Sequence, residues 1–163
     1  MELHKIIDSI ILEIYLQMPS LGTWPFTIIH INRDELSGLQ MDKNLFAPFQ
    51  LLVLKRTHFN SEDLLDYVMK SNEYQTVEDG LKNKFLEKYY KMIADENEFQ
   101  QWIDRTTSLA IGLVIQKGLQ RGLQFSPIKT DFSALNTHMG LEQKKLSAYQ
   151  LFDVHPIDPS LLI

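Results

Sequence analysis

Apolar residues recur at steps of three and four along much of the chain, which is the spacing of one helix face. The longest such stretch runs from Asn97 to Phe125, and within it Leu109 to Ile115 is apolar on every side. A helix that is apolar all round is normally surrounded by other elements. The pattern therefore predicts a buried central helix over residues 97–122, opened by a capping box of Asn97 and Gln100.

Four further segments have a helical pattern. A stripe of leucine and isoleucine predicts a helix over about residues 2–17, which Pro19 ends. A second helix should start at Asn60 or Ser61, and a third should cover residues 77–93 and form a hairpin with the central helix. Leu141 to Phe152 should form the last helix.

Two segments are ambiguous. Residues 26–32 (FTIIHIN) contain β-branched residues that favour a strand, but Thr27 could also cap a helix, and we favour the helix. Residues 42–59 either form a helix with Pro48 in its first turn or contain a buried strand, QLLVLKR. The fold class that follows is mainly α: an orthogonal bundle of about six helices around the central helix. One short strand pair near residues 26–32 and 50–56 is the alternative.

The chain of 163 residues is predicted to hold one helical domain over residues 1–152, followed by a proline-containing tail over 153–163. Residues 126–140 read as a long loop, and because long loops are often functional, this is the first place to look for function. Gly112, Gly118 and Gly122 each lower helix propensity. We expect them to allow close packing or to cap the helix, and the alternative is that they let a ligand reach the backbone.

Composition narrows the classes of function. Apolar residues make up 44% of the chain, which predicts a globular core. The formal charge of −5 argues against nucleic-acid binding, and a helix-turn-helix within residues 27–59 would carry too few cations. The chain has no cysteine and no apolar stretch long enough for a membrane span. These features predict a soluble, cytoplasmic protein with no nucleic-acid or membrane partner.

Few residues suggest chemistry. If residues 26–36 are helical, His30 and Asp34 stand one turn apart, as a general base and its orienting carboxylate would, although we favour a surface histidine that makes a local ion pair. Asp153, His155 and Asp158 are candidate metal ligands, with a solvated tail as the alternative. There is no nucleophile motif and no glycine-rich phosphate loop, so no cofactor is predicted.

Acidic residues gather between residues 62 and 79, where they could form one face that docks on a basic protein. The candidate partner-binding residues are Glu62, Asp63, Asp66, Glu73, Glu78 and Asp79. With a substantial core and no catalytic motif, the sequence favours a non-enzymatic interaction module: an adaptor, a chaperone or an immunity-type inhibitor. The competing hypothesis is a small enzyme or ligand-binding sensor that uses His30 and Asp34. Whether the chain also forms a homo-oligomer is not decided by the sequence.

Overall fold

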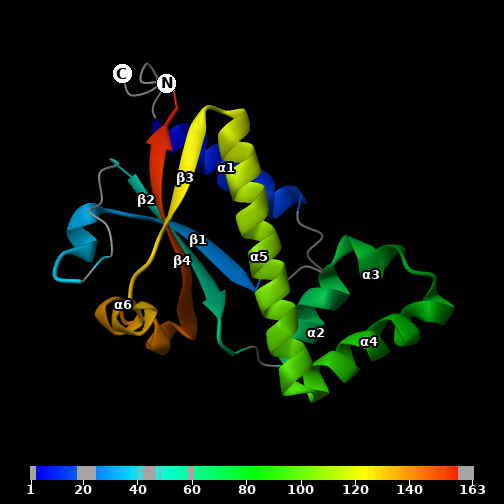
Figure 1. The fold of residues 1–163 in the computed structure, drawn as a ribbon. Coiled ribbons are helices and arrows are strands. Elements are labelled where there is room, and N and C mark those ends of the chain that lie inside the picture. The colour runs from blue at the N-terminus through cyan, green and yellow to red at the C-terminus, as the bar shows by residue number, and fades with distance from the viewer. Residues whose placement is uncertain are drawn as a thin grey trace.

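A four-stranded antiparallel sheet forms the centre of the computed structural model, which describes residues 3–17, 25–39, 41, 47, 49–58 and 61–157. The strand order is β1-β2-β4-β3 (Figure 1). The strands are β1 (Phe26–Ile31), β2 (Phe49–Arg56), β3 (Leu123–Ile128) and β4 (Leu146–Pro156). The two middle strands, β2 and β4, pair with each other and are covered on both faces, so they carry most of the sheet's buried residues.

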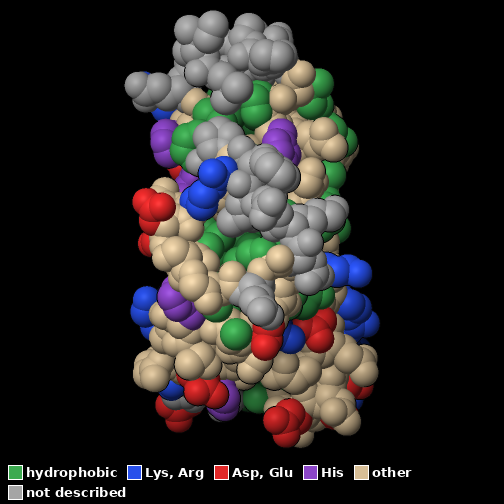
Figure 2. All heavy atoms as spheres, turned by 60° about the vertical axis from the view of Figure 1, so that its left-hand side comes forward, with side chains coloured by type: hydrophobic (Ala, Val, Ile, Leu, Met, Phe, Trp, Pro, Cys, Tyr) green, Lys and Arg blue, Asp and Glu red, His purple; other side chains and the backbone are tan. Residues whose placement is uncertain are grey.

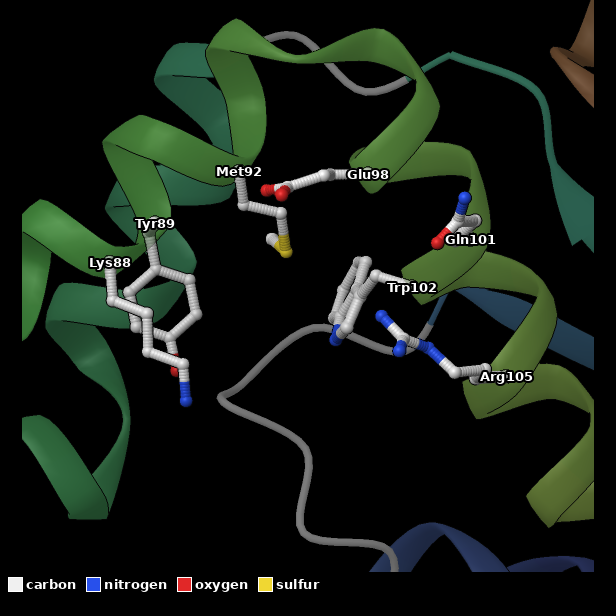
Figure 3. Close-up of a pocket in the computed structure, with 7 residues that line it drawn as sticks. All are labelled: Lys88, Tyr89, Met92, Glu98, Gln101, Trp102 and Arg105. Atoms are coloured by element: carbon white, nitrogen blue, oxygen red, sulfur yellow. The ribbon is translucent and has the colours of Figure 1, made fainter.

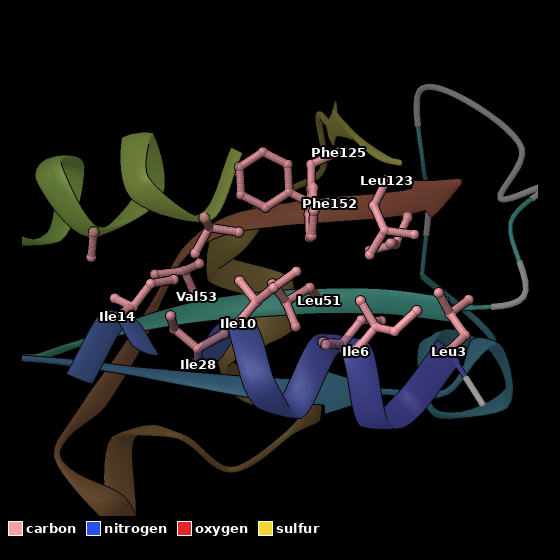
Figure 4. Packing of buried hydrophobic residues seen from close by; sticks show 14 of the residues in the cluster. Leu3, Ile6, Ile10, Ile14, Ile28, Leu51, Val53, Leu123, Phe125 and Phe152 are labelled. Atoms are coloured by element: carbon pink, nitrogen blue, oxygen red, sulfur yellow. The ribbon is translucent and has the colours of Figure 1, made fainter. Parts of the chain in front are cut away.

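Two helices cover one face of the sheet: α1 (Leu3–Gln17) and α5 (Glu96–Gln120). The isoleucine stripe of α1 packs with Ala110 and Val114 of α5 against Leu51 and Phe152 of the strands (Figure 4). Burial of one such aliphatic side chain contributes about 1.5–3 kcal/mol, so this cluster is a major source of stability. The buried isoleucines of α1 are Ile6, Ile7, Ile10 and Ile14.

The opposite face of the sheet is covered by shorter elements. These are α6 (Phe132–His138) and the single-turn 3-10 helices η1 (Arg33–Leu36) and η3 (Glu142–Lys144). Leu36 and Leu135 pack on Leu52 and Leu151 there, in a second apolar cluster. The sheet is therefore buried on both faces.

A group of helices beside the sheet connects β2 to α5 (Figure 1). It contains α2 (Ser61–Lys70), α3 (Asn72–Thr76), η2 (Asp79–Leu81) and α4 (Lys82–Ala94). Its own small core is built on Val68, Leu86 and Tyr89, and Trp102 of α5 packs against it. Because the later part of α5 packs on the sheet and its first part packs on α4, this 25-residue helix joins the two parts.

The prediction of a mainly helical bundle around residues 97–122 was wrong, because the sheet is the central element. The predicted helix exists as α5, but it covers one face of the sheet. Residues 26–31 are β1 and not a helix, and they pair with β2 in the strand pair that was the alternative. The helix-turn-helix considered for residues 27–59 is replaced by these strands. Leu51 to Leu54 are buried on both sides, so the alternation that identifies a strand is missing.

The C-terminal assignments also need correction. The helix predicted over Leu141 to Phe152 was wrong, since these residues form η3 and most of β4. Residues 153–156, which were assigned to a tail, complete β4, and the rest of that tail after Ile157 lies outside the described residues. The predicted loop 126–140 contains the end of β3 and all of α6. One domain over residues 1–152 stays a prediction.

The predicted helix near residues 2–17 is confirmed as α1. The start of α5 differs from the prediction: Asp95, not Asn97, is the N-cap, and its carboxylate accepts hydrogen bonds from the backbone of Asn97 and Glu98. Gly122 follows α5 with φ of 74°, the left-handed conformation that ends many helices. No helix in the described ranges has the length and hydrophobicity needed to cross a bilayer.

Candidate functional site

The structure separates His30 from the carboxylate that was expected to orient it. His30 lies on β1, and its Nε2 is 2.9 Å from Oδ1 of Asp8 on α1. Asp34 lies in η1 and is exposed. The predicted spacing required a helix, and β1 is a strand, so His30 and Asp34 are not one helical turn apart. His30 instead links β1 to α1 through this hydrogen bond, and the centre of the His4 ring lies 5.9 Å from the centre of its own ring.

Asp153 is a buried structural carboxylate. It is 2% exposed, and it accepts hydrogen bonds from the Gln50 side chain at 2.9 Å and from the Ala47 backbone at 3.2 Å. His155 Nε2 lies 3.2 Å from its second oxygen, while Asp158 falls outside the described residues. Within the described ranges no three such residues are grouped as metal ligands, and the histidines visible in Figure 2 are spread over the face shown.

The predicted acidic residues are divided among several helices. Asp66 pairs with Lys70 within α2, and Asp79 pairs with Lys82 at the start of α4. Glu62, Glu73 and Glu78 are exposed on α2, α3 and the residue before η2, and the side chain of Asp63 is not described. Since nearby lysines compensate two of the six carboxylates, the structure supplies no further reason to treat this set as a docking face.

A pocket of about 410 Å³ lies between α4 and α5 (Figure 3). This volume is within the range of small-molecule sites, which is about 300–1,000 Å³. Aromatic and thioether side chains form its walls: Tyr89 and Met92 from α4 and Trp102 from α5. The Phe99 ring stacks on the Trp102 ring, with the two ring centres 5.9 Å apart. The remaining lining residues are Lys88, Glu98, Gln101 and Arg105.

Helical spacing explains how the pocket assembles. Glu98, Trp102 and Arg105 follow one another at steps of four and three on α5, so they share a face. Lys88 and Met92 stand one turn apart on α4 and face them. The hairpin between the two helices, closed by the Asp95 cap, sets these two faces opposite each other.

The pocket carries a net positive charge, because Lys88 and Arg105 face one carboxylate, Glu98. Neither cation pairs with a carboxylate in the part of the chain that the structure describes. Burial, with a smaller contribution from the negative charge of Glu73, raises the pKa of Tyr89 to about 12. Tyr89 therefore keeps its proton at neutral pH and can donate a hydrogen bond. The pocket thus offers a flat apolar wall beside donors and positive charge.

No protein family and no curated protein sequence matches this chain. Solved structures do. A nitroreductase family protein of Streptococcus pneumoniae is 13% identical with a TM-score of 0.67, over 94% of this chain and 80% of that one. A candidate nitroreductase of Bacillus subtilis is 11% identical with a TM-score of 0.72, and the match covers 98% of this chain and 81% of that one. The chain has a nitroreductase-like fold. A candidate NAD(P)H:FMN oxidoreductase of Staphylococcus epidermidis is 15% identical with a TM-score of 0.66, and the match covers 94% of this chain and 76% of that one.

This similarity corrects the functional prediction. An all-helical, non-enzymatic interaction module was wrong, because the fold is an α+β fold whose solved examples here are described as nitroreductases and oxidoreductases. The prediction relied on missing motifs, and absence of a local motif does not exclude a site assembled from distant residues.

Sequence reasoning missed the pocket because its residues looked like ordinary helix faces. In the sequence, Tyr89 and Met92 lie at the spacing of one face of α4, and Trp102 lies in the apolar stripe of α5, so all three look like core residues. The usable signal was Arg105, a cation one turn from Trp102, with Gln101 beside it. Such polar residues flanking a large aromatic residue are unusual for a fully buried face.

Proposed function

We propose that this chain is an FMN-dependent oxidoreductase and that the α4–α5 pocket binds the flavin. The proposal takes its cofactor from a solved structure with the same fold, a Clostridium difficile protein described as an FMN-dependent nitroreductase. That protein is 13% identical with a TM-score of 0.56, over 97% of this chain and 79% of that one. Since a fold alone does not determine function, the proposal depends on whether the side chains of the pocket suit a flavin.

The side chains of the pocket fit the chemistry of FMN, which combines a planar tricyclic ring with a phosphate. Trp102, held by Phe99, offers a ring face for stacking. Lys88 and Arg105 offer positive charge to a phosphate without first having to break an ion pair within the described residues. Gln101 can both donate to and accept from the amide-like edge of a flavin.

The observation that carries the proposal is the combination, in one pocket of this fold, of Trp102 with two cations that form no ion pair within the described residues. When bound, a flavin would supply hydride transfer, which no side chain provides. The protein's own contribution is to bind and orient. Tyr89 remains protonated and donates, while the apolar wall of Met92 and Trp102 excludes water from one side of the ligand.

The test is the affinity for FMN, measured by quenching of flavin fluorescence on titration with the chain. The double variant Lys88→Ala/Arg105→Ala should weaken binding by about tenfold or more, because a charged hydrogen bond contributes about 1.5–3 kcal/mol. Trp102→Ala should also weaken binding, because an aromatic pair contributes about 0.5–1.5 kcal/mol beyond the apolar area that it buries. The matched control is Lys84→Ala/Lys91→Ala, which removes two exposed lysines from the same helix α4. Equal affinities for the pocket variants and the control would contradict the proposal.

A further inference from the structure

Among the described residues that line the α4–α5 pocket, Glu98 is the one carboxylate. Its side chain is exposed and takes part in no hydrogen bond or ion pair within the ranges that the structure describes. Glu96 also lies in the first turn of α5, where a negative charge stabilises the helix end, but it is not among the lining residues. Of the two, Glu98 is therefore placed to contact a ligand in the pocket.

The pocket carries opposite charges at its two ends. Glu98 lies at the same end as Met92, near the turn that joins α4 to α5 (Figure 3). Lys88 precedes Met92 by one turn of α4. Arg105 follows Glu98 by two turns of α5, which is about 10 Å along the helix axis at a rise of about 1.5 Å per residue. An anionic group of a ligand is therefore attracted to the end with Lys88 and Arg105, and repelled from the end with Glu98.

This separation of charge determines which end of a flavin suits Glu98. The ring system of an oxidised flavin carries a single N–H group, at N3, with a carbonyl on either side. A carboxylate only accepts hydrogen bonds, so N3–H is the one ring group that can bind Glu98 when the phosphate lies at Lys88 and Arg105. Gln101 comes three residues after Glu98 on the same helix face, and its amide can donate to a carbonyl beside N3.

We propose that Glu98 orients the flavin by accepting a hydrogen bond from N3–H, and that it thereby selects flavins that carry a hydrogen at N3. The inference rests on the proposed function, since it concerns the same pocket and the same cofactor. Trp102 supplies the surface on which the ring stacks. Glu98 and the two cations decide which end of the flavin faces the turn between α4 and α5.

The experiment compares FMN with 3-methyl-FMN, in which a methyl group replaces the hydrogen on N3. The two dissociation constants are measured by quenching of flavin fluorescence on titration with the full chain. The wild-type chain should bind FMN about tenfold or more tightly than 3-methyl-FMN, which is the effect of one charged hydrogen bond. Glu98→Ala should remove this preference, because it removes the acceptor. Loss of the negative charge near the phosphate affects both flavins alike, so it cancels in the ratio of the two constants.

Glu96→Ala is the matched control, because it removes the same charge from the same turn of α5 and lies outside the pocket lining. This variant should keep the wild-type preference for FMN. Circular dichroism checks that each variant is folded. If Glu98→Ala failed to fold, Glu98→Gln would replace it, and this variant should lower the preference because its acceptor oxygen is uncharged.

The outcomes separate this inference from the proposed function. A wild-type chain that binds FMN and 3-methyl-FMN equally well would overturn the role of Glu98 and leave the flavin site standing. A preference that persists in Glu98→Ala would do the same, as would equal weakening of both flavins in this variant, which would indicate a contact with the ribityl hydroxyls. No binding of FMN to the wild-type chain would overturn the proposed function, and the inference with it.

Discussion

Gly118 lies where α5 meets β3, and replacing it by alanine tests how closely the two elements pack. A Cβ atom at this position would stand 2.1 Å from Cε2 and 2.6 Å from Cδ2 of Phe125. The Phe125 ring is itself buried and makes an edge contact with Phe152 at 6.1 Å. The ring therefore has little freedom to move away, and the substitution forces the helix and the strand apart.

Gly112 provides the matched control, because it is on the same helix and a Cβ there would meet nothing within 4 Å. Both substitutions gain the same helix propensity, about 1 kcal/mol. Only Gly118→Ala adds overpacking, which costs about 1–3 kcal/mol. The difference in unfolding free energy between the two variants should therefore be about 1–3 kcal/mol, with Gly118→Ala the less stable.

Urea unfolding followed by circular dichroism measures this difference, provided that both variants unfold with the same denaturant dependence. Gly112→Ala should be as stable as the wild type or more so. If Gly118→Ala were as stable as Gly112→Ala, α5 would not approach β3 as closely as the structure indicates, and the placement of α5 on the sheet would be refuted.

Three further predictions concern single side chains. Asp95→Ala should lower the unfolding free energy by about 0.5–2 kcal/mol through loss of the α5 cap, while Asn97→Ala should change it little; equal effects in urea titrations would contradict the cap. Asp153→Ala should cost at least about 2 kcal/mol without any metal present, because it leaves buried donors unsatisfied, and a loss below about 1 kcal/mol would argue against this role. Because the pKa of Tyr89 is raised from 10.0 to about 12, the unfolded chain releases this proton first, so stability should fall between pH 10 and pH 12. The unfolding free energy of Tyr89→Phe should fall less over that range. Identical profiles of unfolding free energy against pH for the variant and the wild type would refute the raised pKa of Tyr89.

The sequence predicted those elements whose pattern depends on local spacing. The helix α1 could be found because Ile6, Ile10 and Ile14 repeat along one face. The long helix α5 could be found for the same reason, although its position on a sheet could not. Gly122 was expected either to cap α5 or to allow close packing, and its φ of 74° identifies a cap.

The sheet could not be recognised because its middle strands are buried on both faces. Leu51 to Leu54 on β2 and Leu151 to Val154 on β4 are all buried, so apolar residues do not alternate with polar ones. Even the one polar residue within these runs, Asp153, is buried and satisfied by Gln50, 103 positions away. Pairing between such distant segments leaves no local signal.

The candidate site was missed because its residues come from two helices, and on each helix they resemble an ordinary face. Tyr89 and Met92 lie on α4, while Trp102 and Arg105 lie on α5. Only the hairpin between the two helices brings them together. Local spacing drew attention instead to His30 and Asp34, whose relation depended on a helix that the sheet replaces.

Equilibrium dialysis of the wild-type chain with FMN and with riboflavin tests most directly whether the α4–α5 pocket binds FMN through its phosphate and its ring. Riboflavin has the same ring and lacks the phosphate. We expect saturable binding of a single FMN per chain, with an affinity about tenfold or more above that for riboflavin, because Lys88 and Arg105 would hold the phosphate. No saturable binding of FMN, or equal binding of the two flavins, would contradict it.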